Sequence, residues 1–208
     1  LQRIRCRPAD GTPTDALHNQ FLIFDLGLNL SGFIGAELAC DQPARVYLAF
    51  DELLAADGDV DHLRLNCANC IRLDLAPGRY RFESFEPYTL RYLKLIALDR
   101  PVRVERVWLR EYANSQAGRA RFACADDRLN RVFAAGVETF RQNAADLFMD
   151  CPHRERAGWL CDSFFTARAE ASLTGGSPVE HAFLENFLLP DSFPNLPPGM
   201  LPMCWPAD

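Results

Sequence analysis

The sequence predicts a multi-domain β + α fold, an antiparallel β-sandwich followed by a separate helical region. Between residues 21 and 112, short apolar or alternating segments recur at spacings of roughly 10–15 residues, which is typical of a sandwich. Residues 113–120 are small and polar and are expected to form a linker. After them the apolar residues recur with the period of an α-helix, so a second domain is expected over residues 121–208.

Seven segments of the β-sandwich domain, residues 21–112, are expected to form strands. Residues 71–75 alternate apolar and charged side chains, as a half-buried strand does. A turn is expected at Ser31–Gly32, and residues 1–20 are expected to be an irregular lead-in because Pro residues interrupt them. The expected strands are residues 21–24, 33–38, 45–50, 71–75, 80–84, 90–96 and 102–109.

Three helices are expected in the second domain. Asp126–Asp127 can cap the first helix, whose apolar side chains form one stripe. The second helix is expected from about residue 162 to residue 173, before Gly175–Gly176. Pro178 favours the start of a third helix, and residues 189–208, with six Pro, are expected to form an ordered loop. The stripe on the first helix consists of Leu129, Val132, Phe133, Val137 and Phe140.

Charge and composition exclude several classes of protein. The formal net charge is −6 and the only Lys is Lys94, with no basic stripe of the kind that binds nucleic acid. No apolar stretch approaches the roughly 20 residues of a membrane span, so no membrane span is expected. A hydrophobic content of 49% excludes a disordered chain. The localisation, whether exported, periplasmic or cytoplasmic, stays open.

The eight cysteines are too sparse for a disulfide scaffold in a chain of 208 residues. Cys67 and Cys70 form the one local pair, and no second CxxC or HxxxH follows to complete a structural zinc site. Free thiols are therefore expected, with a disulfide or metal clip at Cys67 and Cys70 as the alternative.

Residues 150–162 (DCPHRERAGWLCD) are the densest group of chemically active side chains. They lie between two expected helices, where a loop can line a pocket. Asp150, Glu155 and Asp162 are not at helical spacing, so they are not one solvated helix face. Glycoside hydrolysis needs one carboxylic acid and a second carboxylate, and a Trp such as Trp159 can pack on a sugar ring. From spacing alone, a polar loop between helices with structural salt bridges remains the favoured explanation.

This segment resembles the DCPxRExxGWxGD signature of bacterial α-L-rhamnosidases, inverting glycosidases with an (α/α)6 catalytic barrel. Cys161 departs from the pattern, because the family usually has Gly there. Residues 24–32, 51–58 and 85–92 are similar to segments of the sandwich that precedes the barrel in this family. The positions that match the signature are Asp150, Cys151, Pro152, Arg154, Glu155, Gly158, Trp159 and Asp162.

The resemblance implies a role for each site residue. Glu155 would be the catalytic general acid. Asp150 and Asp162 would bind rhamnose hydroxyls and help to keep the proton on Glu155, while Arg154 and Trp159 would line the same sugar pocket. No metal or cofactor is implied as necessary, although Ca²⁺ binding is compatible with the family.

Other side chains of the helical region receive no catalytic role. His153 falls at a variable position of the signature and is expected to be a surface or loop-packing residue. The family's general base is a Glu much later in the barrel, and nothing in this chain matches it. Glu180 and Glu185 come too early in the fold and are expected to be solvated or salt-bridged.

The resemblance therefore implies a fragment: a sandwich and the first helices of a truncated (α/α)6 barrel, which by itself would be inactive. Its ligands would be rhamnose-containing glycosides. Exposed barrel helices, around Phe133, Phe140, Phe164, Phe183 and Phe187, are expected to favour self-association. Two alternatives remain, a non-catalytic carbohydrate-binding β-sandwich protein and a related barrel glycosidase with a different sugar specificity.

Overall fold

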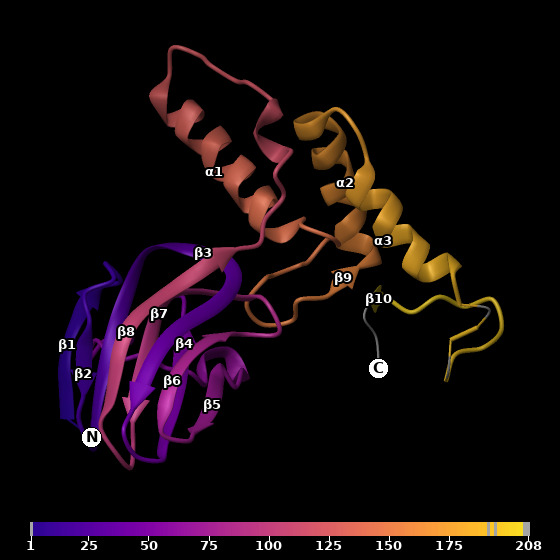
Figure 1. Ribbon diagram of the computed structural model, residues 1–208. Coiled ribbons are helices and arrows are strands. Elements are labelled where there is room, and N and C mark those ends of the chain that lie inside the picture. Colours follow the sequence, from indigo (N-terminus) through magenta and orange to yellow (C-terminus); the bar gives the residue numbers. More distant parts are fainter. Residues whose placement is uncertain (1, 191, 194, 206–208) are drawn as a thin grey trace. The chain divides into compact units, whose positions relative to one another are not determined.

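The chain divides into two compact units, which are described separately. The computed structural model describes residues 2–190, 192–193 and 195–205 (Figure 1). The first unit is Leu1–Glu111 and consists of strands, and the second is Tyr112–Asp208 and consists mainly of helices. The change from strands to helices follows the change in sequence pattern.

The strands of the first unit form one continuous hydrogen-bonded sheet that folds over its own core as a sandwich (Figure 1). A short 3-10 helix, Arg64–Asn66, lies between the fourth and fifth strands. The strands are β1 Gln2–Pro8, β2 Thr14–Ala16, β3 Gln20–Cys40, β4 Ala44–Asp51, β5 Cys70–Leu75, β6 Gly78–Glu83, β7 Tyr88–Ala97 and β8 Val102–Glu111.

The long strand β3 connects the two sides of this sandwich. Over residues 20–25 it pairs with β1 in parallel and with β7 in antiparallel orientation. Over residues 32–40 it pairs with β6 and β8, both antiparallel. The register with β7 shifts between Asp25 and Leu30, so β3 bends there and passes from one side to the other.

Alternating apolar side chains of these strands fill the space between the two sides. Leu22, Ile34, Leu48 and Leu95 are each fully buried. Full burial of a Leu or Ile side chain contributes roughly 2 kcal/mol of hydrophobic stabilisation, so this alternation is what selects the register of the strands.

Two expectations for the β unit are wrong. The lead-in 1–20 is not irregular, because it contains β1 and β2, which obtain their backbone partners from β3 and β8. Ser31–Gly32 is not a turn, because both residues lie inside β3. The Ser31 hydroxyl lies 2.7 Å from that of Thr89, and a Cβ on Gly32 would stand 2.3 Å from a backbone oxygen. Gly32 therefore permits a close approach of strands instead of reversing the chain.

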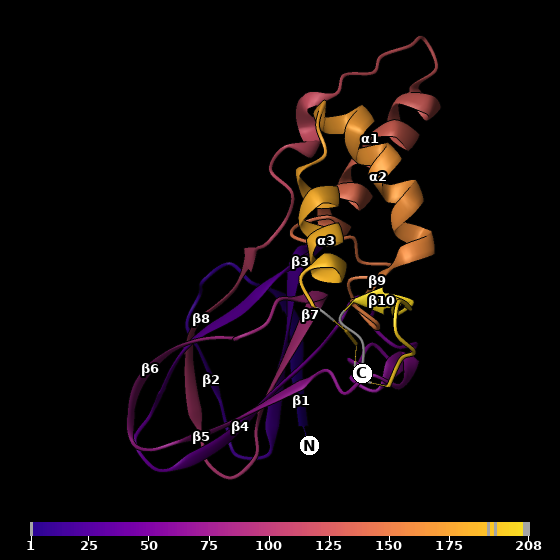
Figure 2. The ribbon, with the colours of Figure 1, turned by 90° about the vertical axis from the view of Figure 1, so that its right-hand side faces the viewer.

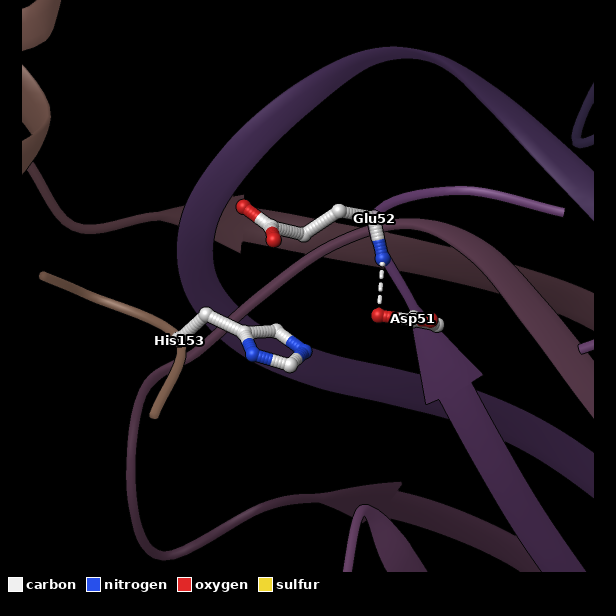
Figure 3. A group of neighbouring side chains, drawn as sticks. All are labelled: Asp51, Glu52 and His153. Carbon is white, nitrogen blue, oxygen red and sulfur yellow. Dashed lines mark hydrogen bonds between the residues drawn. The ribbon is translucent and has the colours of Figure 1, made fainter. Parts of the chain in front are cut away.

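A buried ion pair attaches the 3-10 helix to the end of β4. The Asp51 side chain is fully buried, and Arg64 donates to it through Nε at 2.6 Å and Nη2 at 2.8 Å. Arg64 Nη2 also donates to Glu52 at 2.7 Å, and the Glu52 backbone N–H donates to Asp51 at 2.8 Å (Figure 3). The hydrogen bonds to the Asp51 carboxylate raise the pKa of Arg64 above its already high value.

The described part of the helical unit contains three α-helices, and the start of the first, the end of the second and the start of the third follow the expected residues. Helix α1, Asp127–Asn143, begins after Asp126, whose side chain accepts from the Arg128 N–H at 2.9 Å. Helix α2, Leu160–Thr174, ends at Gly175 with a φ of 77°. Helix α3, Pro178–Leu188, has Pro at its first turn. Within the described part of the chain, no helix combines the length and apolar character needed to cross a membrane.

The three helices share an apolar core, and α2 contacts both α1 and α3 (Figure 2). Phe140, Phe183 and Phe187 are buried in it, so the expectation that these three would be exposed is wrong. Phe164 and its neighbour Phe165 do lie open to solvent, at 56% and 68% exposure. The core takes apolar side chains from all three helices, and Phe164 and Phe165 of α2 lie outside it.

A buried carboxylate joins α2 to α3. Glu170 is fully buried and accepts from the backbone N–H groups of Val179 at 2.8 Å and Glu180 at 2.9 Å. The first N–H groups of a helix have no partner within the helix, and a carboxylate placed there also favours the helix dipole. Glu170 therefore fixes where α3 begins.

The Asp51–Arg64 pair should contribute more to stability than an exposed pair. We expect Arg64→Ala to lower the free energy of unfolding by about 3 kcal/mol, because it removes the cation from a buried carboxylate. Arg45→Ala is the matched control, since it breaks the exposed pair with Asp74 and should cost under about 1 kcal/mol. Urea unfolding measures both, and equal losses would contradict the structural role of Asp51.

The Glu170 contact makes a local prediction about α3. We expect Glu170→Ala to speed amide hydrogen exchange at Val179 and Glu180, because it removes two charge-assisted hydrogen bonds that are together worth roughly 3 kcal/mol. Glu185→Ala, which removes an exposed carboxylate of the same helix, is the control and should leave exchange unchanged. Unchanged exchange in both variants would show that α3 does not depend on this cap.

Candidate functional site

The segment between α1 and α2 is a loop closed by its own backbone. The Asp150 N–H donates to the Ala157 carbonyl at 3.0 Å, and the Arg156 N–H donates to the Cys151 carbonyl at 3.0 Å. Arg156 takes a left-handed φ of 53°, uncommon for a residue other than Gly. Residue 155 is therefore held at the end of a short closed loop.

Both carboxylate oxygens of Glu155 have partners inside this loop. Trp159 Nε1 donates to Oε2 at 2.8 Å, and Arg154 forms an ion pair with Oε1. The Glu155 backbone N–H lies 3.3 Å from the Cys151 sulfur, which accepts from it. The side chain of Glu155 is 31% exposed, so the carboxyl is partly open to a ligand.

Asp150 and Asp162 line one pocket of about 500 Å³, which lies entirely within the helical unit. Asp150 comes from the start of the loop and Asp162 from the first turn of α2. Carboxylates, hydroxyls and an amide stand beside apolar walls, a mixture that suits a polar ligand with C–H faces. The other lining residues are Gly136, Thr139, Phe140, Asn143, Met149, Phe165, Thr166 and Ala169.

The predicted site residues thus fall into two groups. Asp150 and Asp162, at the two ends of the segment, line the same pocket. Glu155, Arg154 and Trp159 form a second group, joined by an ion pair and a hydrogen bond. The residues that line this pocket do not include the second group.

A rigid base supports the second group. Gly158–Trp159 (β9) pairs antiparallel with Cys204–Trp205 (β10), a short strand inside the segment expected to be a loop. A Cβ on Gly158 would lie 2.4 Å from the ring of Phe183, so only Gly fits there. The backbone that carries Trp159 is therefore fixed against the helical core.

His153 and Cys161 are the two positions of the segment for which the sequence implied no catalytic role or a departure from the signature. His153 is buried, and Cys161 occupies the first helical turn of α2, where a Cβ is accommodated.

The cysteines described, including Cys67 and Cys70, are free thiols. In the described residues of the helical unit, no three metal-ligating side chains converge.

Sequence reasoning missed Phe165 and Thr166 as pocket residues. They follow Asp162 by three and four positions, so on a helix they lie on the same side as Asp162. Helical spacing from the candidate residue Asp162 could therefore have identified Phe165 and Thr166 from the sequence.

Comparison with known proteins connects this geometry to a family. The model of the bacterial α-L-rhamnosidase six-hairpin glycosidase domain matches residues 117–207. No curated protein matched the chain. Among solved structures, a GH78 family rhamnosidase of Bacillus sp. GL1 is 28% identical with a TM-score of 0.69, covering 78% of this chain and 17% of that one.

Two further structures share the fold. The rhamnosidase from Klebsiella oxytoca with rhamnose bound is 18% identical, with a TM-score of 0.67, over 84% of this chain and 37% of that one. The Streptomyces avermitilis α-L-rhamnosidase complexed with L-rhamnose is 20% identical, with a TM-score of 0.61, over 88% and 19%. The chain thus spans 17% to 37% of the length of these structures. The chain is therefore similar to the bacterial α-L-rhamnosidase six-hairpin domain over residues 117–207, and it shares its fold with the matching part of these structures.

Proposed function

We propose that this chain supplies the acid half of the active site of a glycosidase that removes terminal α-L-rhamnosyl residues with inversion. The observation that carries the proposal is the closed loop 150–157, which holds Glu155 partly exposed while Asp150 and Asp162 line a neighbouring pocket of the same unit. Two of the solved relatives hold rhamnose, which supports this sugar as the ligand.

In this proposal Glu155 is the general acid. An inverting glycosidase needs an acid that protonates the leaving oxygen and a base, about 6.5–9.5 Å away, that activates water on the opposite face of the sugar. Glu155 delivers the proton to the glycosidic oxygen as the bond from that oxygen to the anomeric carbon breaks. The base comes from a part of the complete protein outside these 208 residues, so the 208-residue chain by itself is expected to be inactive.

Asp150 and Asp162 bind the sugar in this proposal. Carboxylates accept hydrogen bonds from vicinal hydroxyls, and the Thr139, Asn143 and Thr166 side chains add further polar partners in the same pocket. The rings of Phe140 and Phe165 offer apolar walls for the C–H faces and the methyl group of a 6-deoxy sugar.

The acid role predicts a large loss on Glu155→Gln. In the complete encoded protein, we expect kcat on an alkyl α-L-rhamnoside to fall by about 10²–10⁴, because the amide cannot donate the proton. Hydrolysis rates and NMR of the first anomer released measure the loss and the stereochemistry. Glu185→Gln makes the same chemical change on an exposed face of α3 and should keep wild-type activity.

Two results would count against the proposal. Full activity of Glu155→Gln would remove the acid assignment, and a product of retained configuration would remove the inverting mechanism. A complete protein that binds rhamnose without hydrolysing any rhamnoside would favour the carbohydrate-binding alternative.

A further inference from the structure

We infer that Trp159 is a positioning residue for Glu155, and that its indole N–H assigns the transferable proton to the other carboxyl oxygen, Oε1. The inference rests on the proposed function, because it concerns the acid of that reaction. It also gives Trp159 a different role from the sugar-lining role expected from the sequence.

Trp159 Nε1 donates a hydrogen bond to Glu155 Oε2 at 2.8 Å. The indole nitrogen is a donor only, so Oε2 must present a lone pair to it. In a carboxylic acid the carbonyl oxygen is the stronger acceptor, and a proton on Oε2 in the direction of the indole would displace the N–H. The protonated form of Glu155 that best keeps this bond therefore carries its proton on Oε1.

The indole is held by a support that does not depend on the loop. Trp159 pairs with Cys204 in the β9–β10 ladder, and the Leu160 N–H donates to the Met203 carbonyl at 2.9 Å. Gly158 packs directly against Phe183 in the helical core. A functional side chain is positioned best by groups that are themselves fixed, and the Trp159 backbone meets that condition.

Arg154 is the movable partner of the same carboxyl. It pairs with Oε1, the oxygen from which the proton must leave, and its side chain is 52% exposed. A guanidinium is a donor without an acceptor, so Arg154 and the acidic proton cannot occupy the same lone-pair direction of Oε1. Delivery of a proton along the direction that Arg154 now occupies therefore requires Arg154 to move, whereas Trp159 stays on Oε2 before and after the proton has moved to the glycosidic oxygen.

Trp159→Phe separates positioning from stacking, because it keeps an aromatic ring and removes the N–H. Proton donation matters most when the leaving group is poor, so we compare methyl and 2,4-dinitrophenyl α-L-rhamnosides on the complete encoded protein. We expect kcat to fall about 10–100-fold for the methyl glycoside and under about 3-fold for the dinitrophenyl glycoside, with KM unchanged. Glu155→Gln should show the same dependence on leaving group, with a larger loss.

The comparison of the two leaving groups separates a positioning role of Trp159 from a role as a wall of the sugar pocket. A loss of equal size on both substrates, or a change in KM alone, would show that Trp159 is a wall of the sugar pocket and overturn the inference. If Glu155→Gln itself shows no dependence on the leaving group, then the acid assignment fails first, and the proposed function with it.

A second measurement tests the hydrogen bond in the 208-residue chain without any activity. The chain has three Trp, so indole ¹⁵N labelling gives three N–H signals. Glu155→Ala should shift the Trp159 signal toward that of a solvated indole and leave those of Trp108 and Trp205 in place. Glu185→Ala is the matched control and should shift none of them. An unmoved Trp159 signal in Glu155→Ala would overturn the inference whatever the kinetics show.

Discussion

The contact between Gly158 and the ring of Phe183 is the constraint on which the candidate site depends. Phe183 belongs to the helical core, and the backbone at Gly158 approaches it so closely that no side chain fits between them. This contact fixes the position of the short strand that carries Trp159. Helix α2 begins directly after that strand, so the contact also determines the position of Asp162 in the first turn of α2. An apolar packing contact therefore determines the placement of the polar residues, because the core is rigid and the loop is attached to it.

The same kind of constraint explains where sequence reasoning succeeded and failed in the fold. Three of the helix ends were predictable, because Asp126, Gly175 and Pro178 act locally on the backbone there. Gly32 was read as a turn residue although it serves a close strand approach, and the local sequence cannot distinguish these two uses of Gly. Strands β1 and β2 were missed because their partners, β3 and β8, are distant in sequence.

For the candidate site, the sequence indicated the residues but not their grouping. Asp150 and Asp162 could be selected as carboxylates off a common helix face, and the structure brings them to one pocket. The partners of Glu155 could not be foreseen, because a Trp near a carboxyl is equally suited to stack on a sugar or to donate its N–H. The direction of the indole decides between these uses, and in the structure its N–H donates to Glu155 from a backbone that the β9–β10 pairing holds.

A carboxyl that acts as a proton donor needs one oxygen that is held and one that is released. In this chain the two partners of Glu155 differ in this respect: Trp159 is neutral and its backbone belongs to a strand pair, whereas Arg154 is charged, half exposed and adjacent to Glu155 in sequence. A charged donor on both oxygens would keep the group ionised, and no donor at all would leave the direction of the proton undefined. In the proposed mechanism, one fixed neutral donor and one displaceable cation satisfy both requirements, which gives Trp159 and Arg154 complementary roles at the proposed acid Glu155.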